Sequence, residues 1–307
     1  MRFSGKSEEE IALEENKTAN DTQQTERTVN PYSAKAVKRA LGRKRVGELL
    51  ILFVFMLFFY GPLLHACMLA FANVYAAGDV IPSEWGFHWW GYVLGQQNVP
   101  RAIFNSFLFA FCSTGLSLLI CIPAAYVLAR FKFKGRKLIM FSFLIGNAFP
   151  KIGMYTAIGI IYYRIGLMGT FLGVLLIHML GTTMEMIWLP AGAFRSVPKH
   201  QEEAARDAGA GPVRTFFSVT LPIAWPGIVV AAMHAFIGSL GESVGTLLVG
   251  LPQWRTMMTE MYGVILDFPA TAGAVFAIII VVPNMFLLWI MRKYVSADTM
   301  AKGFKMG

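Results

Sequence analysis

Three ionisable side chains, those of Lys151, Glu185 and Glu242, lie well inside long apolar stretches of the sequence. An ionised side chain at the centre of a bilayer costs about 2.5 to 3.5 kcal/mol even on lenient scales, so such groups face protein or water and usually pair. We expect Lys151 to be neutralised by Glu185 or by Glu242. The functional alternative is that these charges line a polar path through the membrane.

Asn147 belongs to the same set of substrate-path candidates, because it lies four residues before Lys151 and shares its face of a helix. Pro150 lies between them and removes a backbone hydrogen bond, which a membrane helix tolerates only where other groups compensate. A lysine at this place favours a solute that carries negative charge, such as a uronate-containing saccharide.

Catalytic or metal chemistry would need several reactive side chains at one membrane depth. The histidines are instead scattered over different segments, which favours a structural or tuning role for each of His65, His88, His178, His200 and His234. The cysteines fall in apolar stretches without paired spacing, which indicates buried, inert thiols at Cys67, Cys112 and Cys121. An intramembrane glycosyl or acyl transferase remains an alternative that buried charges alone would permit.

A charged, alanine-rich stretch, "EEAARDAGAGPVRTFFSVTLP", separates two of the apolar runs. Pro198 suits the start of a helix and Gly209 the left-handed position after its end, so we predict a helix of about three turns between them. Small residues share one face of this helix, which suits close docking of another backbone: Gln201, Ala204, Ala205 and Ala208.

The charges of this helix point to partners elsewhere. Glu202 and Arg206 form a favourable pair four residues apart, whereas Glu203 and Asp207 place like charges at the same spacing. Either Glu203 and Asp207 meet another chain, or water solvates both. A second short amphipathic helix follows from Pro212, until Pro222 turns the chain into the next apolar run.

The elements that position these residues are membrane helices. The chain of 307 residues is 56% hydrophobic and only 15% charged, far from the composition of a soluble protein. A bilayer core of roughly 30 Å needs about 20 apolar residues per helix. We therefore predict an all-α membrane protein with six transmembrane helices, over residues 47–74, 102–129, 138–163, 170–194, 223–248 and 271–291.

The distribution of Lys and Arg predicts the orientation. Of 27 such residues, 10 precede the first span, 5 lie in 130–137, 4 in 195–214 and 4 after residue 291. This alternation places both termini and the 198–222 loop in the cytoplasm. The net charge of +9 is thus a topology signal, and we expect no nucleic-acid partner.

Two domains follow from the same pattern: a cytoplasmic tail over 1–45 and a transmembrane domain over 46–307, with a cytoplasmic end at 292–307. Residues 1–32 are polar and we expect them to be disordered. The basic segment 34–45 suits anionic membrane lipid. The outer segment "EWGFHWWGYVLG" predicts a short helix at the membrane surface rather than a substrate cage.

The 198–222 stretch resembles the "EAA" loop of permease subunits of ATP-binding-cassette (ABC) importers, of the maltose-type carbohydrate family. The residues at the family's spacing are Glu203, Ala204, Ala205, Gly209, Phe216, Leu221 and Pro222. The segments "RAIFNSFLFA", "AAYVLARFKFKGRK", "GLMGTFLGVLLIH" and "AKGFKMG" extend the resemblance over most of the chain. One departure is "DAGA", which adds Ala208 and is also found in importers of polyamines. Another is "GSLGESVGTLL", in which Glu242 matches the family but its neighbours Gly241 and Ser243 do not.

The resemblance implies a transport subunit without an active site of its own. It implies a homologous second permease, two copies of an ATP-binding subunit and an extracytoplasmic solute-binding protein as partners. The 198–222 loop would be a coupling helix, docking through Glu203, Ala204, Ala205, Asp207, Gly209, Leu221 and Pro222, with 303–307 reaching between the ATPase subunits. ATP and Mg would be used by the partner, since no G-x-x-x-x-G-K-[ST] loop occurs in this sequence. A secondary transporter driven by ion gradients is a third alternative. Its sequence would be expected to show inverted repeats or broken helices, and we find no convincing internal repeat in this sequence.

Overall fold

The computed structural model describes residues 34–76 and 78–292, with side chains from residue 45 onward. The predictions for the tail at 1–32 and for the C-terminal segment 293–307 lie outside the described residues. Two compact units meet between Leu64 and His65.

In the described part of the first unit, residues 34–64 belong to one long helix, α2, which begins at Ala34 and ends at Leu69. Its stretch Arg45–Leu69 is long and apolar enough to cross a membrane. The side chains from Val46 to Tyr60 are exposed on every face of the helix, as expected for a span that lipid surrounds. The basic segment before it is helical from residue 34, so the predicted boundary at residue 45 does not interrupt the backbone structure.

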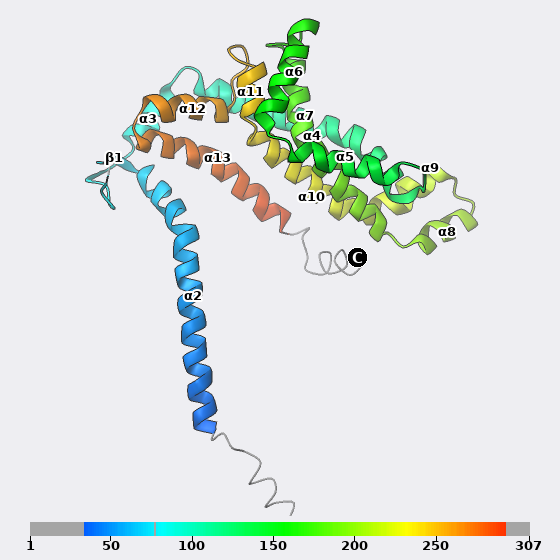
Figure 1. Cartoon of the computed structure of the whole chain (residues 1–307), viewed down its shortest axis with the longest axis horizontal. Coiled ribbons are helices and arrows are strands. Elements are labelled where there is room, and N and C mark those ends of the chain that lie inside the picture. Colours follow the sequence, from blue (N-terminus) through cyan, green and yellow to red (C-terminus); the bar gives the residue numbers. More distant parts are fainter. Residues whose placement is uncertain (1–33, 77, 293–307) are drawn as a thin grey trace, which may run out of the picture. The chain divides into compact units, whose positions relative to one another are not determined.

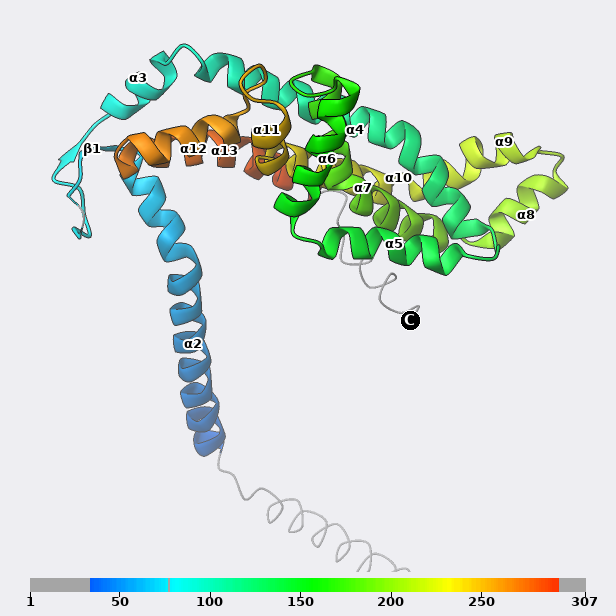
Figure 2. The ribbon, with the colours of Figure 1, turned by 45° about the horizontal axis from the view of Figure 1, so that its top comes forward.

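The described residues of the second unit are mostly helical and include one small antiparallel pair of strands, β1 and β2. Figure 1 and Figure 2 show its elements, which run in the order β1 (Ala72–Val74), β2 (Glu84–Trp85), α3 (His88–Gly95), α4 (Val99–Arg130), α5 (Arg136–Ala148), α6 (Lys151–Ile165), α7 (Phe171–Ser196), α8 (Lys199–Asp207), α9 (Pro212–Thr215), the π-helix η1 (Phe216–Thr220), α10 (Leu221–Leu240), α11 (Val244–Val249), α12 (Met257–Asp267) and α13 (Ala270–Met291).

Five helical stretches among the described residues are long and apolar enough to span a membrane, and a bent pair raises the number to six. The bent pair is α5 with α6, which meet at an angle of 101° around Phe149 and Pro150. The prediction of one continuous helix over 138–163 is therefore wrong. Pro150 cannot donate to the ladder, and the residue before a proline avoids the helical conformation, so the helix breaks there.

The end of the fifth predicted span is also wrong. The helix stops at Leu240, the chain passes through Gly241 to Ser243, and a short helix, α11, begins at Val244. The first predicted span is likewise too long, because α2 ends at Leu69 and residues 72–74 form strand β1.

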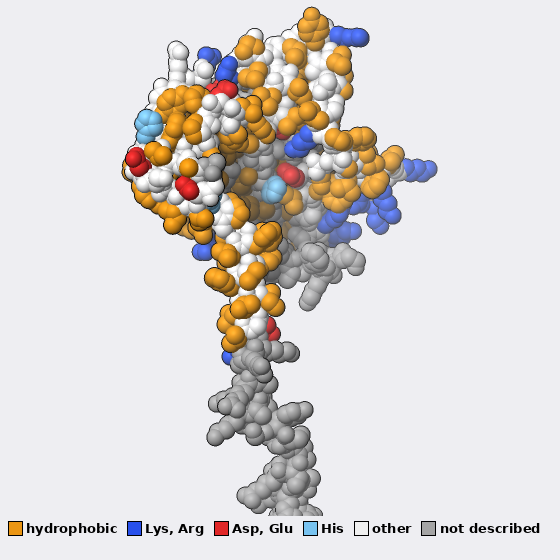
Figure 3. Space-filling model, turned by 60° about the vertical axis from the view of Figure 1, so that its left-hand side comes forward, with side chains coloured by type: hydrophobic (Ala, Val, Ile, Leu, Met, Phe, Trp, Pro, Cys, Tyr) orange, Lys and Arg blue, Asp and Glu red, His pale blue; other side chains and the backbone are white. Residues whose placement is uncertain are grey.

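The core of the second unit lies where α4, α7 and α10 pack together, as both ribbon views show (Figure 1, Figure 2). Small and medium side chains fill the contacts, among them Ala125, Ala191, Ile228 and Ala231. Many of the exposed side chains outside this core are also apolar, as the orange side chains on the face drawn in Figure 3 show. A chain with a packed three-helix core and an apolar exterior fits a lipid environment.

The outer segment forms the predicted short helix, α3, although it starts at His88. The indole N–H groups of Trp89 and Trp90 donate to the carbonyl oxygens of Asn73 and Ala70, at 3.1 and 2.7 Å. Both rings pack against a buried cluster that includes Val275 on α13. The position of α3 at a membrane surface stays a prediction.

The three cysteines differ in burial. Cys121 is buried and Cys112 half-buried, but Cys67 is exposed. The prediction of a buried thiol is therefore wrong for Cys67, because this end of α2 presents it away from the packed core.

Candidate functional site

The predicted docking helix is present as α8, which begins after Pro198 and ends before Ala208. Gly209 follows in the left-handed conformation, with φ of +84°, and its N–H donates to the carbonyl of Arg206 at 2.9 Å. The chain restarts as a helix at Pro212. The helix, the turn and their bounding residues are thus confirmed.

The outer surface of this loop is open. Glu203, Ala204, Asp207, Gly209 and Pro222 are exposed, and Ala205 and Leu221 are partly covered. Among the described residues, no carboxylate of Glu203 or Asp207 forms an ion pair within the chain. Within the described part of the chain, both acidic groups are therefore exposed and unpaired.

Glu202, by contrast, turns inward. Its carboxylate lies 2.9 Å from the Arg130 guanidinium, and the two side chains are only 9% and 8% exposed. The hydroxyl of Thr220 donates to the same carboxylate oxygen at 2.7 Å. The predicted pairing of Glu202 with Arg206 is wrong, because an arginine from another helix offers a buried charge-assisted bond that an exposed neighbour on α8 does not.

Arg130 completes a four-way junction between the helices. It ends α4, and its guanidinium also donates to the carbonyl oxygen of Val197, just after α7, at 2.8 Å. Glu202 lies on α8 and Thr220 ends η1. A displacement of α8 is therefore resisted by direct bonds from Glu202 to the ends of α4 and η1, and through Arg130 by the bond to the end of α7.

The second helix of the loop does not stop at Pro222 as predicted. Instead α9, η1 and α10 follow one another, so that 212–240 forms one long span. The extra residue of the π-turn accommodates Pro222 near the start of α10, where a missing N–H is tolerated. Phe216 turns inward and lies 4.8 Å, between ring centroids, from Tyr126 on α4.

A second polar cluster surrounds Glu242, which is 5% exposed. One carboxylate oxygen accepts the N–H of Gly245 at 2.8 Å, at the start of α11. The other accepts the hydroxyl of Tyr155 at 3.2 Å and lies 3.9 Å from the Lys151 ammonium. Of the two expected partners for Lys151, the structure selects Glu242.

Glu185 has a different partner. Its carboxylate lies 3.2 Å from a ring nitrogen of His234 on α10. The four substrate-path candidates are thus split. Lys151 and Glu242 belong to one cluster, while Glu185 pairs with a residue that sequence reasoning did not associate with it.

Asn147 and Lys151 line a cavity of about 310 Å³ beside the break between α5 and α6. They do not share one helical face, since Asn147 lies in the last turn of α5 and Lys151 begins α6. The break nevertheless brings both to one cavity, together with Tyr155, Gly181 and Thr183. Lys151 is 52% exposed, so its ammonium is available to that space.

The role of Arg130 was missed from the sequence. Arg130 was counted as a topology signal, and nothing in its spacing identifies Glu202 as its partner.

His178 was expected to have a structural or tuning role. It is fully buried and stacks on Phe109, with its ring nitrogens 2.7 Å from the hydroxyl of Ser239 and 3.0 Å from that of Thr246. This network ties α7 to α10 and α11, in agreement with a structural role for the histidine.

Comparison with known proteins identifies the family. Residues 121–298, more than half of the chain, match the family described as binding-protein-dependent transport system inner membrane component. The chain belongs to this family. It is therefore a multi-pass transport subunit of the inner membrane and not an enzyme, and the predicted resemblance to ABC importer permeases is confirmed.

The relatives support this membership along most of the chain. NgcG of Streptomyces coelicolor, a diacetylchitobiose uptake permease, is 27% identical over 80% of this chain and 83% of its own length. GanQ of Bacillus subtilis, a galactooligosaccharide transport permease, is 26% identical over 84% and 94%. ORF1 of Streptomyces antibioticus, named as an ABC transporter permease, is 33% identical over 48% of this chain and 64% of its own length.

Solved structures share the fold. A chain of the bacterial ABC transporter that imports the acidic polysaccharide alginate aligns over 86% of this chain and 99% of its own, with a TM-score of 0.63 and 18% identity. A chain of the MetNI methionine ABC transporter aligns over 64% and 96%, with a TM-score of 0.54 and 19% identity. Such identities establish the arrangement of helices and leave the cargo open.

Proposed function

We propose that this chain is one of two permease subunits of an ATP-driven importer, and that α8 is its coupling helix. The observation that carries this proposal is the two-sided build of α8. One side presents the exposed Glu203, Ala204 and Asp207, while the other is tied through buried Glu202 to Arg130. A movement that an ATPase imposes on the exposed side would therefore reach the ends of the spans.

The proposal includes the partners that such a path needs. A homologous second permease encloses the path with this chain, two copies of an ATP-binding subunit use ATP and Mg, and a solute-binding protein delivers the cargo outside. In this proposal the bent pair α5 and α6 is one span, so the chain has six spans. The distribution of Lys and Arg supports placing both termini in the cytoplasm. Cysteine labelling from either side of the membrane, at residue 203 and at residue 91, tests this orientation.

The coupling role is tested in the reconstituted transporter. Glu203→Ala removes an exposed docking group, so we expect ATP hydrolysis that no longer drives uptake, with unchanged insertion and thermal stability. Arg101→Ala serves as the control. Arg101 is also exposed, but it lies at the start of α4, at the opposite end of that helix from Arg130 and the α8 contact. Normal uptake by the Glu203→Ala transporter would contradict the proposal.

For the cargo, we propose a sugar, oligosaccharide or polyol, on the strength of relatives named for diacetylchitobiose and galactooligosaccharide transport. The half-exposed ammonium of Lys151 beside the 310 Å³ cavity favours an acidic saccharide and disfavours a cationic polyamine, the alternative that "DAGA" suggested. In Lys151→Met, uptake of acidic sugars should fall more than that of neutral sugars. Equal loss for both kinds of sugar would refute the charge preference.

A further inference from the structure

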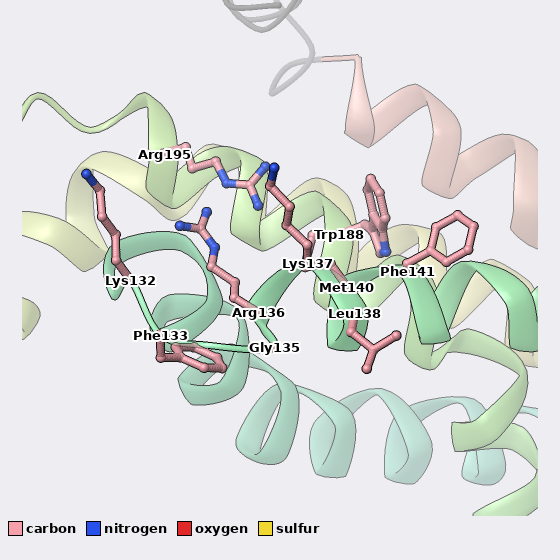
Figure 4. A pocket seen from close by; sticks show the side chains of 10 residues that line it. All are labelled: Lys132, Phe133, Gly135, Arg136, Lys137, Leu138, Met140, Phe141, Trp188 and Arg195. Atoms are coloured by element: carbon pink, nitrogen blue, oxygen red, sulfur yellow. The ribbon is translucent and has the colours of Figure 1, made fainter.

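A second and larger cavity, of about 1000 Å³, lies between the first turns of α5 and the last turns of α7. Four cationic side chains line it: Lys132, Arg136, Lys137 and Arg195. Figure 4 shows them at one end of the cavity, with Arg136, Lys137 and Arg195 extending into the same space. No role in coupling or in the substrate path has been assigned to this site.

These cations lack a counter-charge within the described part of the chain. None of the four forms an ion pair there, and no carboxylate lines the cavity. Arg136 and Lys137 also lie in the first turn of α5, where the helix dipole is positive and no acidic residue follows. Repulsion among the cations and with the dipole makes an anion the favourable occupant of this end.

The other end of the cavity is apolar. Trp188 lies seven residues before Arg195 on α7, which is about 10 Å along the helix. Phe141 lies five residues after Arg136 on α5, about 7.5 Å deeper. Since the two helices run in opposite directions here (Figure 2), both apolar residues lie on the same side of the cations, farther from the helix ends. Leu138, Met140 and Phe133 also contribute apolar side chains to the lining.

We propose that this cavity binds one anionic phospholipid of the cytoplasmic leaflet. The phosphate lies among Arg136, Lys137 and Arg195, at the helix ends where a head-group layer is expected, and an acyl chain lies along Trp188 and Phe141. A basic pocket between spans, with an apolar floor, matches an amphiphile. A saccharide would leave Leu138 and Met140 without apolar contact, and a free phosphate would leave the whole inner half of the cavity unused.

The lipid is tested with the full-length chain in nanodiscs. Brominated acyl chains quench nearby tryptophan, and the difference between the wild-type chain and Trp188→Phe isolates the signal of Trp188. We expect brominated phosphatidylglycerol to quench this signal at a much lower mole fraction than brominated phosphatidylcholine. Equal quenching by the two lipids would overturn the proposal.

Charge variants give the second measurement. The preference for phosphatidylglycerol should fall about fivefold for each cation removed, in Arg136→Gln and then in the double variant with Arg195→Gln. The matched control is Arg101→Gln with Arg164→Gln, which removes two exposed arginines from other ends of the helices. A similar fall in the control would mean a diffuse charge effect and would contradict a site.

Inorganic phosphate separates a lipid from a small anion. At constant ionic strength, millimolar phosphate should leave the Trp188 quenching unchanged, since it offers no acyl chain. If phosphate alone abolishes the quenching, the cavity binds a free anion and the lipid assignment is wrong. Retained quenching with an intact preference for the anionic lipid supports it. Thermal unfolding of each variant verifies that the chain remains folded.

Discussion

Two ion pairs in this chain have similar carboxylates and different cations. Glu202 and Glu242 are both nearly buried, at 9% and 5% exposure of the side chain. Arg130 is 8% exposed and lies 2.9 Å from Glu202, whereas Lys151 is 52% exposed and lies 3.9 Å from Glu242. The first pair is closed to solvent and the second is open on its cationic side.

The neutral partners explain what each pair can do. Glu242 accepts bonds from Gly245 and Tyr155, so its charge is stabilised without the lysine. Glu202 accepts one neutral hydrogen bond, from the hydroxyl of Thr220, and its charge is balanced by Arg130. Arg130 is itself buried and donates to the carbonyl oxygen of Val197. The closed pair therefore joins the helix ends, while the lysine of the open pair is half-exposed and lines the 310 Å³ cavity.

The largest effect should come from breaking the closed pair. Arg130→Met leaves the Glu202 carboxylate buried without its counter-charge, and we expect the free energy of unfolding to fall by about 3 to 5 kcal/mol. Thermal unfolding in detergent measures this. Lys134→Met is the control, because it removes an exposed cation from the loop that follows α4. Equal stability of the two variants would show that the closed pair is not a joint.

Glu242→Gln should have a smaller effect on stability. The amide oxygen can still accept the N–H of Gly245, but the charge that holds Tyr155 and attracts Lys151 is lost, so we expect a loss of about 2 kcal/mol. Glu185→Gln is the matched control, since Glu185 is one-third exposed and pairs with an exposed histidine. A larger loss in Glu185→Gln than in Glu242→Gln would reverse the assignment of the buried site.

The turn beside the closed pair gives a third test. In Gly209→Ala the methyl group meets no atom within 4 Å, but φ of +84° is costly for a residue with a side chain, by about 1 to 2 kcal/mol. Gly211→Ala is the control, because Gly211 has equal space and φ of −67°. Circular dichroism with thermal unfolding should show destabilisation only in Gly209→Ala. Equal effects in both would mean that the left-handed turn does not matter.

Local signals predicted the parts of the fold that depend on a few neighbouring residues. Apolar length located the membrane helices, and Pro198 with Gly209 bounded α8, because each of these rules acts within a turn or two of the chain. The predicted spans ran across the helix breaks at Pro150 and after Leu240, because the apolar composition of the sequence continues across both positions. Hydropathy measures affinity for lipid and is insensitive to whether the helix bends.

Partners across the fold could not be predicted in the same way. The pairing of Glu202 with Arg130 joins residues 72 positions apart, and the pattern within α8 favoured Arg206 instead. Lys151 with Glu242 was one of two alternatives, because nothing in the sequence separates the depths of Glu185 and Glu242. Only the packing of α6 against α11 decides between them.

The smallest change in stability should follow from removing the cation of the open pair, Lys151. Lys151→Met removes a half-exposed cation at 3.9 Å from a carboxylate that keeps its bonds to Gly245 and Tyr155. Solvent screens such a pair, so we expect the free energy of unfolding to change by less than about 1 kcal/mol. Thermal unfolding beside the Arg130→Met chain measures the contrast directly. A loss as large as that of Arg130→Met would mean that Lys151 is a structural counter-ion, and the acidic-solute preference would then lose its physical basis.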